Sequence, residues 1–486
     1  WLPALLRAPE RMFRALGLRA SILRALDVED GVVLRLSGRL PFWPGPGLFL
    51  APVRVLWRAF RFDPRRFRSD PGLRRALQRT RELEKRDLAP LDWAGLHRHL
   101  REVEGLPELV AGELRGKYMW RAVLGVARLR LLLAVVQRKD RLGALLSGTD
   151  SLTSEANAAL ETLAAQVRAR PELMRVFGER DGVELLGALR ETPEGRELLG
   201  ALQGFLDEHG HREVLISTAR EPTWKDAPEL VLSILKGLSA AAPPPPPAKK
   251  EWEQARDDVL AGSALGRAPL RGAFLSALSA GRCVLQLRED THYYGTMALA
   301  LLHRALREMG RRMVAAGALD APEDLFHLRR AELEAWPPST GLREIAARRK
   351  RAREALGEGP LVDPRRFRPA GLERGAVARG TPGSPGLARG PVRVVRSPAE
   401  FGTLRAGEVL VAPFTNPAWT PLFQRAAAVV VDCGSAASHA AIVAREYGIP
   451  AVMGTGDGTE RLTDGQMVRV DGDRGLVLAD TGERIT

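Results

Sequence analysis

The residue whose placement most suggests chemistry is His439, in the segment CGSAASHAAIVAREYG of residues 433–448. The run AAVVVD at 427–432 predicts a buried strand, and a helix is expected to start near Ser438 and to end at Gly448. His439 is therefore expected in the first turn of a helix that follows a small-residue loop. Unpaired N–H groups and the positive end of the helix dipole favour an anion there, and they favour a neutral, nucleophilic imidazole. A phosphoryl group carried by this histidine would lie against the helix amides.

A histidine that only caps the helix or packs half-buried is the alternative interpretation. The small residues at 434–437, beginning with Gly434, leave room for a large phosphoryl donor to approach the imidazole. The residue types by themselves leave both interpretations open.

The elements that must position His439 belong to a chain of ordinary globular composition. Its 486 residues are enough for two or three domains, and 45% of them are hydrophobic and 27% charged. The two cysteines, Cys283 and Cys433, form no CxxC pair, so we expect neither a disulfide framework nor a zinc site. We expect a reducing, cytoplasmic location, because no segment has the pattern of a signal peptide or of a transmembrane helix.

The net charge of +14 would suit phosphate-rich partners such as nucleic acid. The basic residues are spread over helical segments, and aromatic residues make up only 6% of the chain. This pattern indicates solvated helix faces rather than a specific nucleic-acid surface.

Apolar residues at three- and four-residue spacing predict a large, mainly α-helical domain over residues 1–379. Within it, Thr153 or Ser154 is expected to cap a helix. Five consecutive prolines predict an extended connector at 241–250, since proline cannot continue a helix. After a Gly- and Pro-rich boundary, short β-branched runs and two helical pieces predict a compact C-terminal α/β domain over residues 380–486.

Residues 434–477, GSAASHAAIVAREYGIPAVMGTGDGTERLTDGQMVRVDGDRGLV, resemble the swivelling phosphohistidine domain of phosphoenolpyruvate-utilising enzymes. That family includes phosphoenolpyruvate synthase, pyruvate phosphate dikinase and rifampicin phosphotransferase. The matching positions of its histidine motif are Gly434, Ser438, His439, Ala441, Ile442, Ala444, Arg445 and Glu446. The resemblance implies that His439 carries the phosphoryl group, with Gly434, Ser438 and Arg445 binding the phosphate or shaping the loop.

A weaker resemblance to the substrate domain of rifampicin phosphotransferase covers LREDTHYYGTMALALLHRALREMG, which begins at residue 287. It implies that Arg288 steadies the transferring phosphoryl group and that His292 orients or deprotonates an acceptor hydroxyl. It also makes Glu289 a candidate substrate contact. The alternative is an ion pair between Arg288 and Glu289, with His292 as an aromatic packing residue.

The segment HGHREVLISTAREPTWKDAPELVL shows a second such resemblance. Arg212 and Trp224 fall where the family pattern expects them, and Arg212 becomes a candidate substrate-binding residue. Ile216 and Thr218 occupy two positions where the family has acidic residues, so the resemblance leaves the substrate class open.

The resemblance also implies a cofactor and a partner. Family members take the phosphoryl group from ATP with Mg²⁺, bound by an ATP-grasp domain, and nothing in this sequence resembles that domain. The sequence has no G-x-x-x-x-G-K-[ST] loop, and GTGDGT at 454–459 is interpreted as a turn. We therefore expect the ATP-grasp part as a missing N-terminal domain or a separate subunit, and no metal or cofactor on this chain alone.

These observations predict a phosphotransferase component in which His439 passes a phosphoryl group to a small-molecule acceptor held by the helical domain. The alternative is a catalytically degenerate scaffold or regulatory protein that keeps the swivel fold, which Ile216 and Thr218 favour slightly. Binding to nucleic acid or to a membrane surface through net charge alone ranks third.

Overall fold

The computed structural model describes residues 18–20, 26–29, 32–36, 42–45, 48–146, 150–212, 223–240, 249–337, 341–355, 375–415, 419–435 and 438–480. Most of the predicted connector at 241–250, together with Ile216 and Thr218, lies outside the described residues. The chain forms two compact units. The first unit comprises residues 1–124, 217–222 and 287–363, and the second comprises 125–216, 223–286 and 364–486. The domain division predicted at residues 379 and 380 stays a prediction.

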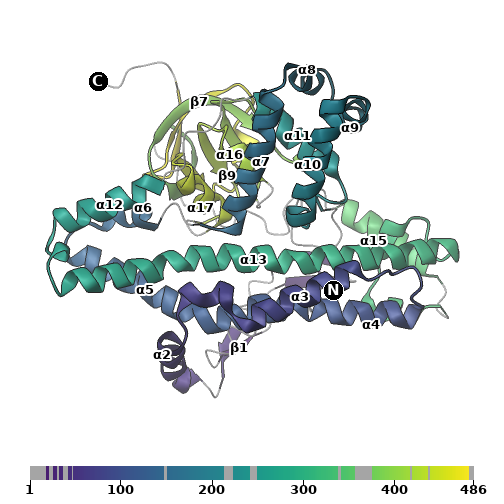
Figure 1. The fold of residues 1–486 in the computed structure, drawn as a ribbon, viewed down its shortest axis with the longest axis horizontal. Coiled ribbons are helices and arrows are strands. Elements are labelled where there is room, and N and C mark those ends of the chain that lie inside the picture. Colours follow the sequence, from purple (N-terminus) through teal and green to yellow (C-terminus); the bar gives the residue numbers. More distant parts are fainter. Residues whose placement is uncertain are drawn as a thin grey trace. The chain divides into compact units, whose positions relative to one another are not determined.

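The first unit is mainly helical (Figure 1). Its helices and helical turns are η2 (Leu48–Leu50), α2 (Ala51–Arg61), η3 (Pro64–Ser69), α3 (Pro71–Lys85), α4 (Trp93–Glu104), the π-helical η4 (Glu108–Leu114), η7 (Pro322–His327), α14 (Arg330–Glu334) and α15 (Leu342–Ala355). It also holds residues 115–124 of α5 (Arg115–Val135) and residues 287–315 of α13 (Leu270–Ala315). One apolar core joins α4 to α13 and α15, through residues such as Leu96, Leu302 and Ala346.

Four short strands in the first unit depart from the helical prediction for this part of the chain. They are β1 (Leu18–Ala20), β2 (Leu26–Glu29), β3 (Val32–Leu36) and β4 (Phe42–Pro44). β1 pairs with β4 and β2 with β3, both antiparallel. Local β-branched valines, such as Val32 and Val33, favour strands here over the helical spacing found further along.

The second unit begins with a group of helices. They are residues 125–135 of α5, α6 (Leu142–Leu146), α7 (Leu152–Arg168), α8 (Pro171–Glu179), α9 (Gly182–Glu191), α10 (Pro193–His209), α11 (Pro228–Ala240), α12 (Lys249–Ala261) and residues 270–286 of α13. The predicted cap of α7 is wrong by a few residues. Ser151 is the N-cap and its side chain accepts a hydrogen bond from the Ser154 N–H, while Thr153 and Ser154 lie inside the helix.

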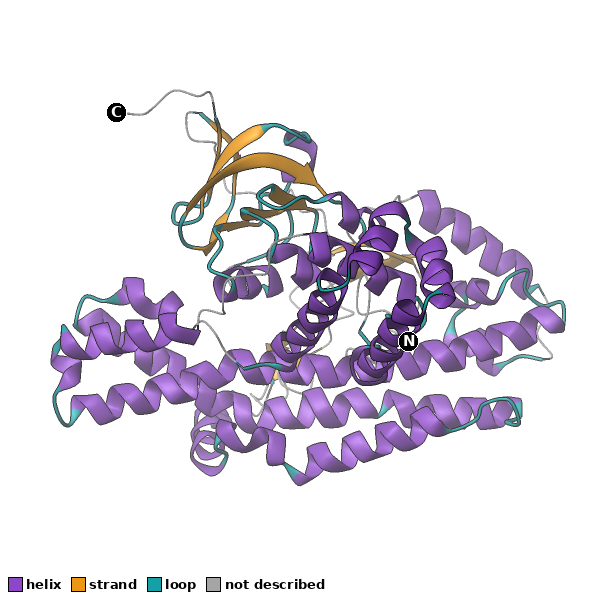
Figure 2. Cartoon of the chain, turned by 45° about the horizontal axis from the view of Figure 1, so that its top comes forward, coloured by secondary structure: helices purple, strands orange, loops and turns teal. Residues whose placement is uncertain are grey.

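The C-terminal part of the second unit is one mixed eight-stranded sheet (Figure 2). Its strands are β5 (Ala376–Arg379), β6 (Thr381–Ser384), β7 (Leu387–Val394), β8 (Val409–Ala412), β9 (Ala428–Val431), β10 (Ala451–Met453), β11 (Met467–Asp471) and β12 (Leu476–Ala479). The strand order is β5-β12-β11-β7-β8-β9-β10-β6, with β7 to β10 parallel. Three short helices, α16 (Thr420–Phe423), α17 (His439–Glu446) and α18 (Gly458–Arg461), follow β8, β9 and β10 respectively.

Alternate residues of the central strands face two different cores, as the period of two in a strand requires. Val409, Val411 and Val430 belong to a core formed among the strands. Leu410 and Val429 belong to a larger core that continues through α17 into α7, α10 and α11. The predicted architecture is confirmed: a large α-helical region is followed by a C-terminal α/β region.

Candidate functional site

His439 is the first residue of α17, as predicted from the sequence. Ser438 caps this helix: its backbone is extended, at φ −69° and ψ 162°, and its Oγ accepts from the Ala441 N–H at 3.5 Å. The Ser438 hydroxyl also donates to the Ser435 carbonyl at 2.8 Å, which ties the helix start to the preceding loop. His439 as a residue is half-buried, and its Nδ1 atom is shielded from solvent.

Thr420 is the side chain that orients the imidazole. Its Oγ1 lies 3.2 Å from Nε2 of His439, within hydrogen-bond distance. Thr420 is fully buried at the start of α16, beside the buried side chains of Trp419 and Phe423. Thr420 was not predicted as a site residue from the sequence, although it lies in the segment NPAWTPLF of the same region.

Two glycines bring the backbone close around the start of α17. A Cβ on Gly434 would lie 3.2 Å from Ser438 Oγ and 3.4 Å from Met453 Sδ. Gly454 has φ +70°, and a Cβ there would lie 2.8 Å from the Gly434 carbonyl oxygen. The loop before His439 therefore packs against the chain after β10 without intervening side chains, and Gly434 itself is exposed.

The segment GTGDGT at 454–459 forms a turn into α18, as predicted, and Asp432 fills the site where an anion would bind. The Asp432 carboxylate accepts from the N–H groups of Gly458 at 2.5 Å and Thr459 at 3.2 Å. It also accepts from the hydroxyls of Thr455 at 2.7 Å and Thr459 at 2.5 Å. Because a buried protein carboxylate already takes these donors, they are not available to a nucleotide phosphate.

Arg445 lies at the other end of α17 from His439, in its last turn. Its Nε donates to the carbonyl of Gly383 on β6 at 2.8 Å. This contact fastens α17 to the edge strand of the sheet. A phosphate-binding role for Arg445 stays a prediction.

Arg288, Glu289 and His292 lie together in the middle of α13, within the first unit. Arg288 Nε is 3.9 Å from a carboxylate oxygen of Glu289. Glu289 is buried, while Arg288 and His292 are half-buried. Burying a charged group is costly unless it is paired or functional, so this stretch is more than a packing face.

Three further charged residues, none of them predicted from the sequence, complete this cluster. Arg115 of α5 donates from Nε to Thr291 Oγ1 at 2.7 Å and from Nη2 to the Arg288 carbonyl at 3.2 Å. Burial lowers the pKa of Arg115, the nearby Arg288 lowers it further, and Glu289 opposes both. Asp290, fully buried, accepts from Arg68 Nε at 2.6 Å. Two adjacent arginines held by buried partners make a place suited to an anionic group.

Comparison with known domains matches both regions. Residues 404–475 match the mobile domain of PEP-utilising enzymes. The resemblance to this enzyme family is confirmed. Residues 117–289 match the fourth domain of rifampicin phosphotransferase. His439, Thr420 and Asp432 all lie within the mobile domain, and Arg212, Arg288 and Glu289 lie within the match to the fourth domain.

Three curated relatives support the same relationship. The chain is 31% identical to the uncharacterized phosphotransferase YvkC of Bacillus subtilis over 68% of this chain and 43% of the relative. It is 30% identical to the rifampicin phosphotransferase of Streptomyces sviceus over 68% of this chain and 40% of the relative. It is 30% identical to the prodigiosin synthesizing transferase PigC of Serratia marcescens over 68% of this chain and 39% of the relative. The chain thus spans less than half the length of these relatives, two of which are named phosphotransferases.

Arg212 lies beyond the end of α10 in the second unit, where it contacts Trp224. The Arg212 guanidinium lies 4.8 Å from the centre of the Trp224 ring, and the Trp224 N–H donates to the Arg212 carbonyl at 3.0 Å. Phe205 stacks on the same indole at 5.7 Å. These contacts show a structural role for Arg212, and its substrate role stays a prediction.

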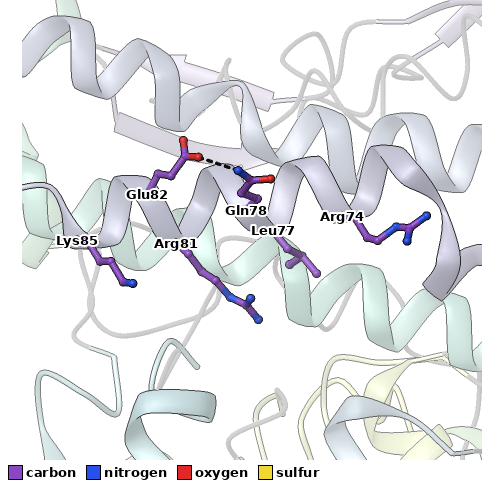
Figure 3. Close-up of a pocket in the computed structure, with 6 residues that line it drawn as sticks. All are labelled: Arg74, Leu77, Gln78, Arg81, Glu82 and Lys85. Carbon is purple, nitrogen blue, oxygen red and sulfur yellow. Dashed lines mark hydrogen bonds between the residues drawn. The ribbon is translucent and has the colours of Figure 1, made fainter.

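A hollow lined by described residues runs along α3 (Figure 3). Its volume is about 580 Å³, and its lining residues are Arg74, Leu77, Gln78, Arg81, Glu82 and Lys85. Because these side chains all come from one helix, the hollow lacks the convergent polar groups of a catalytic pocket. Within the described residues, no group of three or more acidic, histidine or cysteine side chains is placed to hold a metal ion. Among those same residues, no helix is both long and apolar enough to cross a bilayer.

Proposed function

We propose that His439 accepts a phosphoryl group and passes it to a small-molecule acceptor bound by the helical part of the protein. The observation that carries the proposal is the position of His439, a half-buried residue, at the start of α17, with Nε2 lying 3.2 Å from Thr420 Oγ1. The match of the surrounding residues to the mobile domain of PEP-utilising enzymes supports it.

The first half of the proposed reaction is an attack by an imidazole lone pair of His439 on the phosphorus of the donor. For Nε2 to be the nucleophile, its contact with Thr420 must first break. An N–P bond forms, the P–O bond to the donor breaks, and the electron pair leaves with the donor oxygen. The N–H groups of the first turn of α17 would face the resulting negative charge. Small residues on the loop, Gly434 in particular, leave space for the donor.

The second half transfers the group to the acceptor. An acceptor oxygen attacks the phosphorus, the N–P bond breaks, and the imidazole recovers its lone pair. We assign His292 to take the acceptor proton and Arg288, supported by Arg115, to hold the phosphoryl oxygens. The hydrogen bonds of Arg115 support those roles, because they hold its guanidinium group against the turn of α13 that carries Arg288.

We propose ATP with Mg²⁺ as the donor, bound by an ATP-grasp domain or subunit. In that scheme His439 attacks the β-phosphorus and AMP leaves from it, while a water molecule cleaves the bond between the β- and γ-phosphorus groups and phosphate is released. His439 keeps the β-phosphoryl group. The name of the rifampicin phosphotransferase relative supports a small-molecule acceptor.

The test is labelling of His439. The chain is incubated with its cognate ATP-grasp partner, Mg²⁺ and ATP labelled at the β-phosphorus, and the product is examined for a phosphate that is acid-labile and base-stable. We expect labelling of the wild type and none of His439→Asn. His327→Asn is the matched control, because His327 is also half-buried but lies on η7.

A second arm uses phosphoramidate, which phosphorylates accessible imidazoles without an enzyme partner. Labelling of His439 by phosphoramidate, but not by an active ATP-grasp partner, would contradict the donor while supporting the carrier. An unlabelled His439 in both arms would contradict the phosphotransfer function and favour the scaffold alternative.

A further inference from the structure

Helix α2 presents a continuous apolar surface to solvent, and the phosphotransfer chemistry does not use it. The exposed apolar side chains of η2 and α2 form what we call the α2 apolar face. They are Phe49, exposed by 91%, Leu50 by 54%, Val53 by 63%, Leu56 by 51%, Trp57 by 59% and Phe60 by 84%. Single exposed apolar residues are common, but six in one helical segment indicate an interaction site.

The helix rests on the protein through a different face. Ala51, Val55 and Ala59 recur at every fourth position; the two alanines are buried and the valine is half-buried. The α2 apolar face lies on the opposite side of the helix. Figure 1 shows α2 at the periphery of the first unit, apart from α3 and α4. The segment is thus anchored by small residues and displays its large ones.

The third side of α2 is basic. Arg54, Arg58 and Arg61 recur at four- and three-residue spacing along one flank of the apolar face. Residues 48–62 contain these three arginines and no acidic residue. Within the described residues, none of the three is paired with a carboxylate. The partner must therefore accept aromatic and aliphatic side chains and supply negative charge beside them.

An anionic bilayer meets both requirements. A helix with tryptophan, phenylalanine and leucine on one face and arginine on its flank lies in the interface plane of such a bilayer, with the arginines reaching the headgroups. A second copy of this chain fits less well, because it would bring two arginine rows together on molecules that each carry +14.

We propose that the α2 apolar face docks this protein on an anionic lipid surface. Binding through the α2 apolar face uses one amphipathic helix. It therefore differs from attraction through the overall net charge, which ranks low on composition alone. The proposal is independent of the chemistry at His439.

The test is sedimentation of the full chain with vesicles of phosphatidylcholine containing 25% phosphatidylglycerol, in 0.1 M salt. We expect binding to these vesicles and at least tenfold weaker binding to pure phosphatidylcholine. The double variant Trp57→Ser/Phe60→Ser is expected to bind the anionic vesicles at least tenfold more weakly. Its control is Val183→Ser, which changes an apolar residue of α9 that is 74% exposed.

The basic flank is tested by Arg54→Gln/Arg58→Gln/Arg61→Gln. The matched control is Arg74→Gln/Arg75→Gln/Arg81→Gln, which removes the same charge from exposed positions of α3. We expect a several-fold larger loss of binding for the α2 triple variant than for the α3 triple variant. Trp57 gives a direct readout: its emission, obtained as the difference between wild type and Trp57→Phe, should shift to the blue on anionic vesicles.

Several results would overturn the proposal. The wild type could fail to bind anionic vesicles, the two triple variants could lose binding equally, or the serine double variant could bind like wild type. A concentration-dependent dimer that the double variant abolishes, without vesicle binding, would assign the face to self-association instead. Circular dichroism of each variant shows whether it folds, and unchanged labelling of His439 separates this test from that of the proposed function.

Discussion

The hydroxyl of Thr420 and Nε2 of His439 lie 3.2 Å apart, although the two residues begin different helices of the mobile domain. A neutral imidazole has one N–H and one lone pair, so this hydrogen bond fixes the ring plane and selects which nitrogen faces Thr420. The fully buried Thr420 cannot turn toward solvent instead. The geometry makes Thr420 a positioning residue for the proposed carrier.

Replacing Thr420 with valine should slow phosphorylation of His439 without unfolding the protein. Valine keeps the shape of threonine and removes the hydroxyl, whose hydrogen bond contributes about 1 kcal/mol. We expect labelling by phosphoramidate or by the ATP-grasp partner to slow about fivefold to tenfold, with a changed dependence on pH. Rapid-quench measurement of labelled protein between pH 5.5 and 8.5 checks both effects.

Thr420→Ser is the control for this variant, because it keeps the hydroxyl and should label at nearly the wild-type rate. Equal rates and equal pH profiles for valine, serine and wild type would show that the contact has only a structural role.

Replacing Asp432 with asparagine should loosen the turn at 454–459, which lies beside the loop that precedes His439. The carboxylate accepts two backbone N–H groups and two hydroxyls, and the amide of asparagine would point a donor at some of them. We expect the free energy of unfolding to fall by about 2 kcal/mol, since hydrogen bonds to a charged group are among the stronger ones.

Urea denaturation measures this loss, and hydrogen exchange should be faster at the amides of Gly458 and Thr459. Glu460→Gln, an exposed change of the same charge on α18, should alter stability by less than about 0.5 kcal/mol. Similar losses for both variants would contradict the role given to Asp432.

The free energy of unfolding should decrease as the pH is lowered, because of His99, which is fully buried on α4. Burial, aided by Arg86 and Arg304, lowers the pKa of His99 to about 4. The unfolded chain, with an ordinary histidine pKa of about 6.5, takes up a proton below that pH while the folded protein does not. The free energy of unfolding is therefore unaffected by this histidine above about pH 6.5. It decreases by up to about 3 kcal/mol as the pH is lowered from 6.5 to 4.

His99→Leu should show less of this loss in urea denaturation at pH 7, 5.5 and 4.5. His327→Gln, which changes a half-buried histidine, should keep the wild-type slope. If His99→Leu and wild type lose stability equally over this range, another group controls the acid sensitivity.

The start of α17 could be predicted because its signals are local. Ser438 caps the helix and Gly448, at φ +65°, ends it. Serine is a preferred N-cap residue, and glycine is the preferred residue after a helix end. The same kind of signal gave the wrong start for α7. Ser151, Thr153 and Ser154 are all residue types that can cap a helix, and in the structure Ser151 is the cap. A hairpin signal was also missed, since Asp30 and Gly31 stand between the runs that form β2 and β3.

The remaining contacts depend on residues far apart in the chain. Arg115 and Thr291 are separated by 176 positions and meet at 2.7 Å only because α5 and α13 pack together. Thr420 meets His439 because parallel strands β8 and β9 bring the segments after them to one edge of the sheet. Neither pair has a spacing that helix or strand periodicity could reveal.

The core shared by the sheet with α7, α10 and α11 determines how much apolar surface would be exposed if they separated. Leu410 and Val429 of the sheet belong to the same buried cluster as Leu202 and Leu235 of the helices. Pulling the strands away from those helices would wet that apolar surface, at about 25 cal/mol for each Å² uncovered. Any movement of His439 that the proposed transfer requires would therefore cost least if the sheet and these helices moved together.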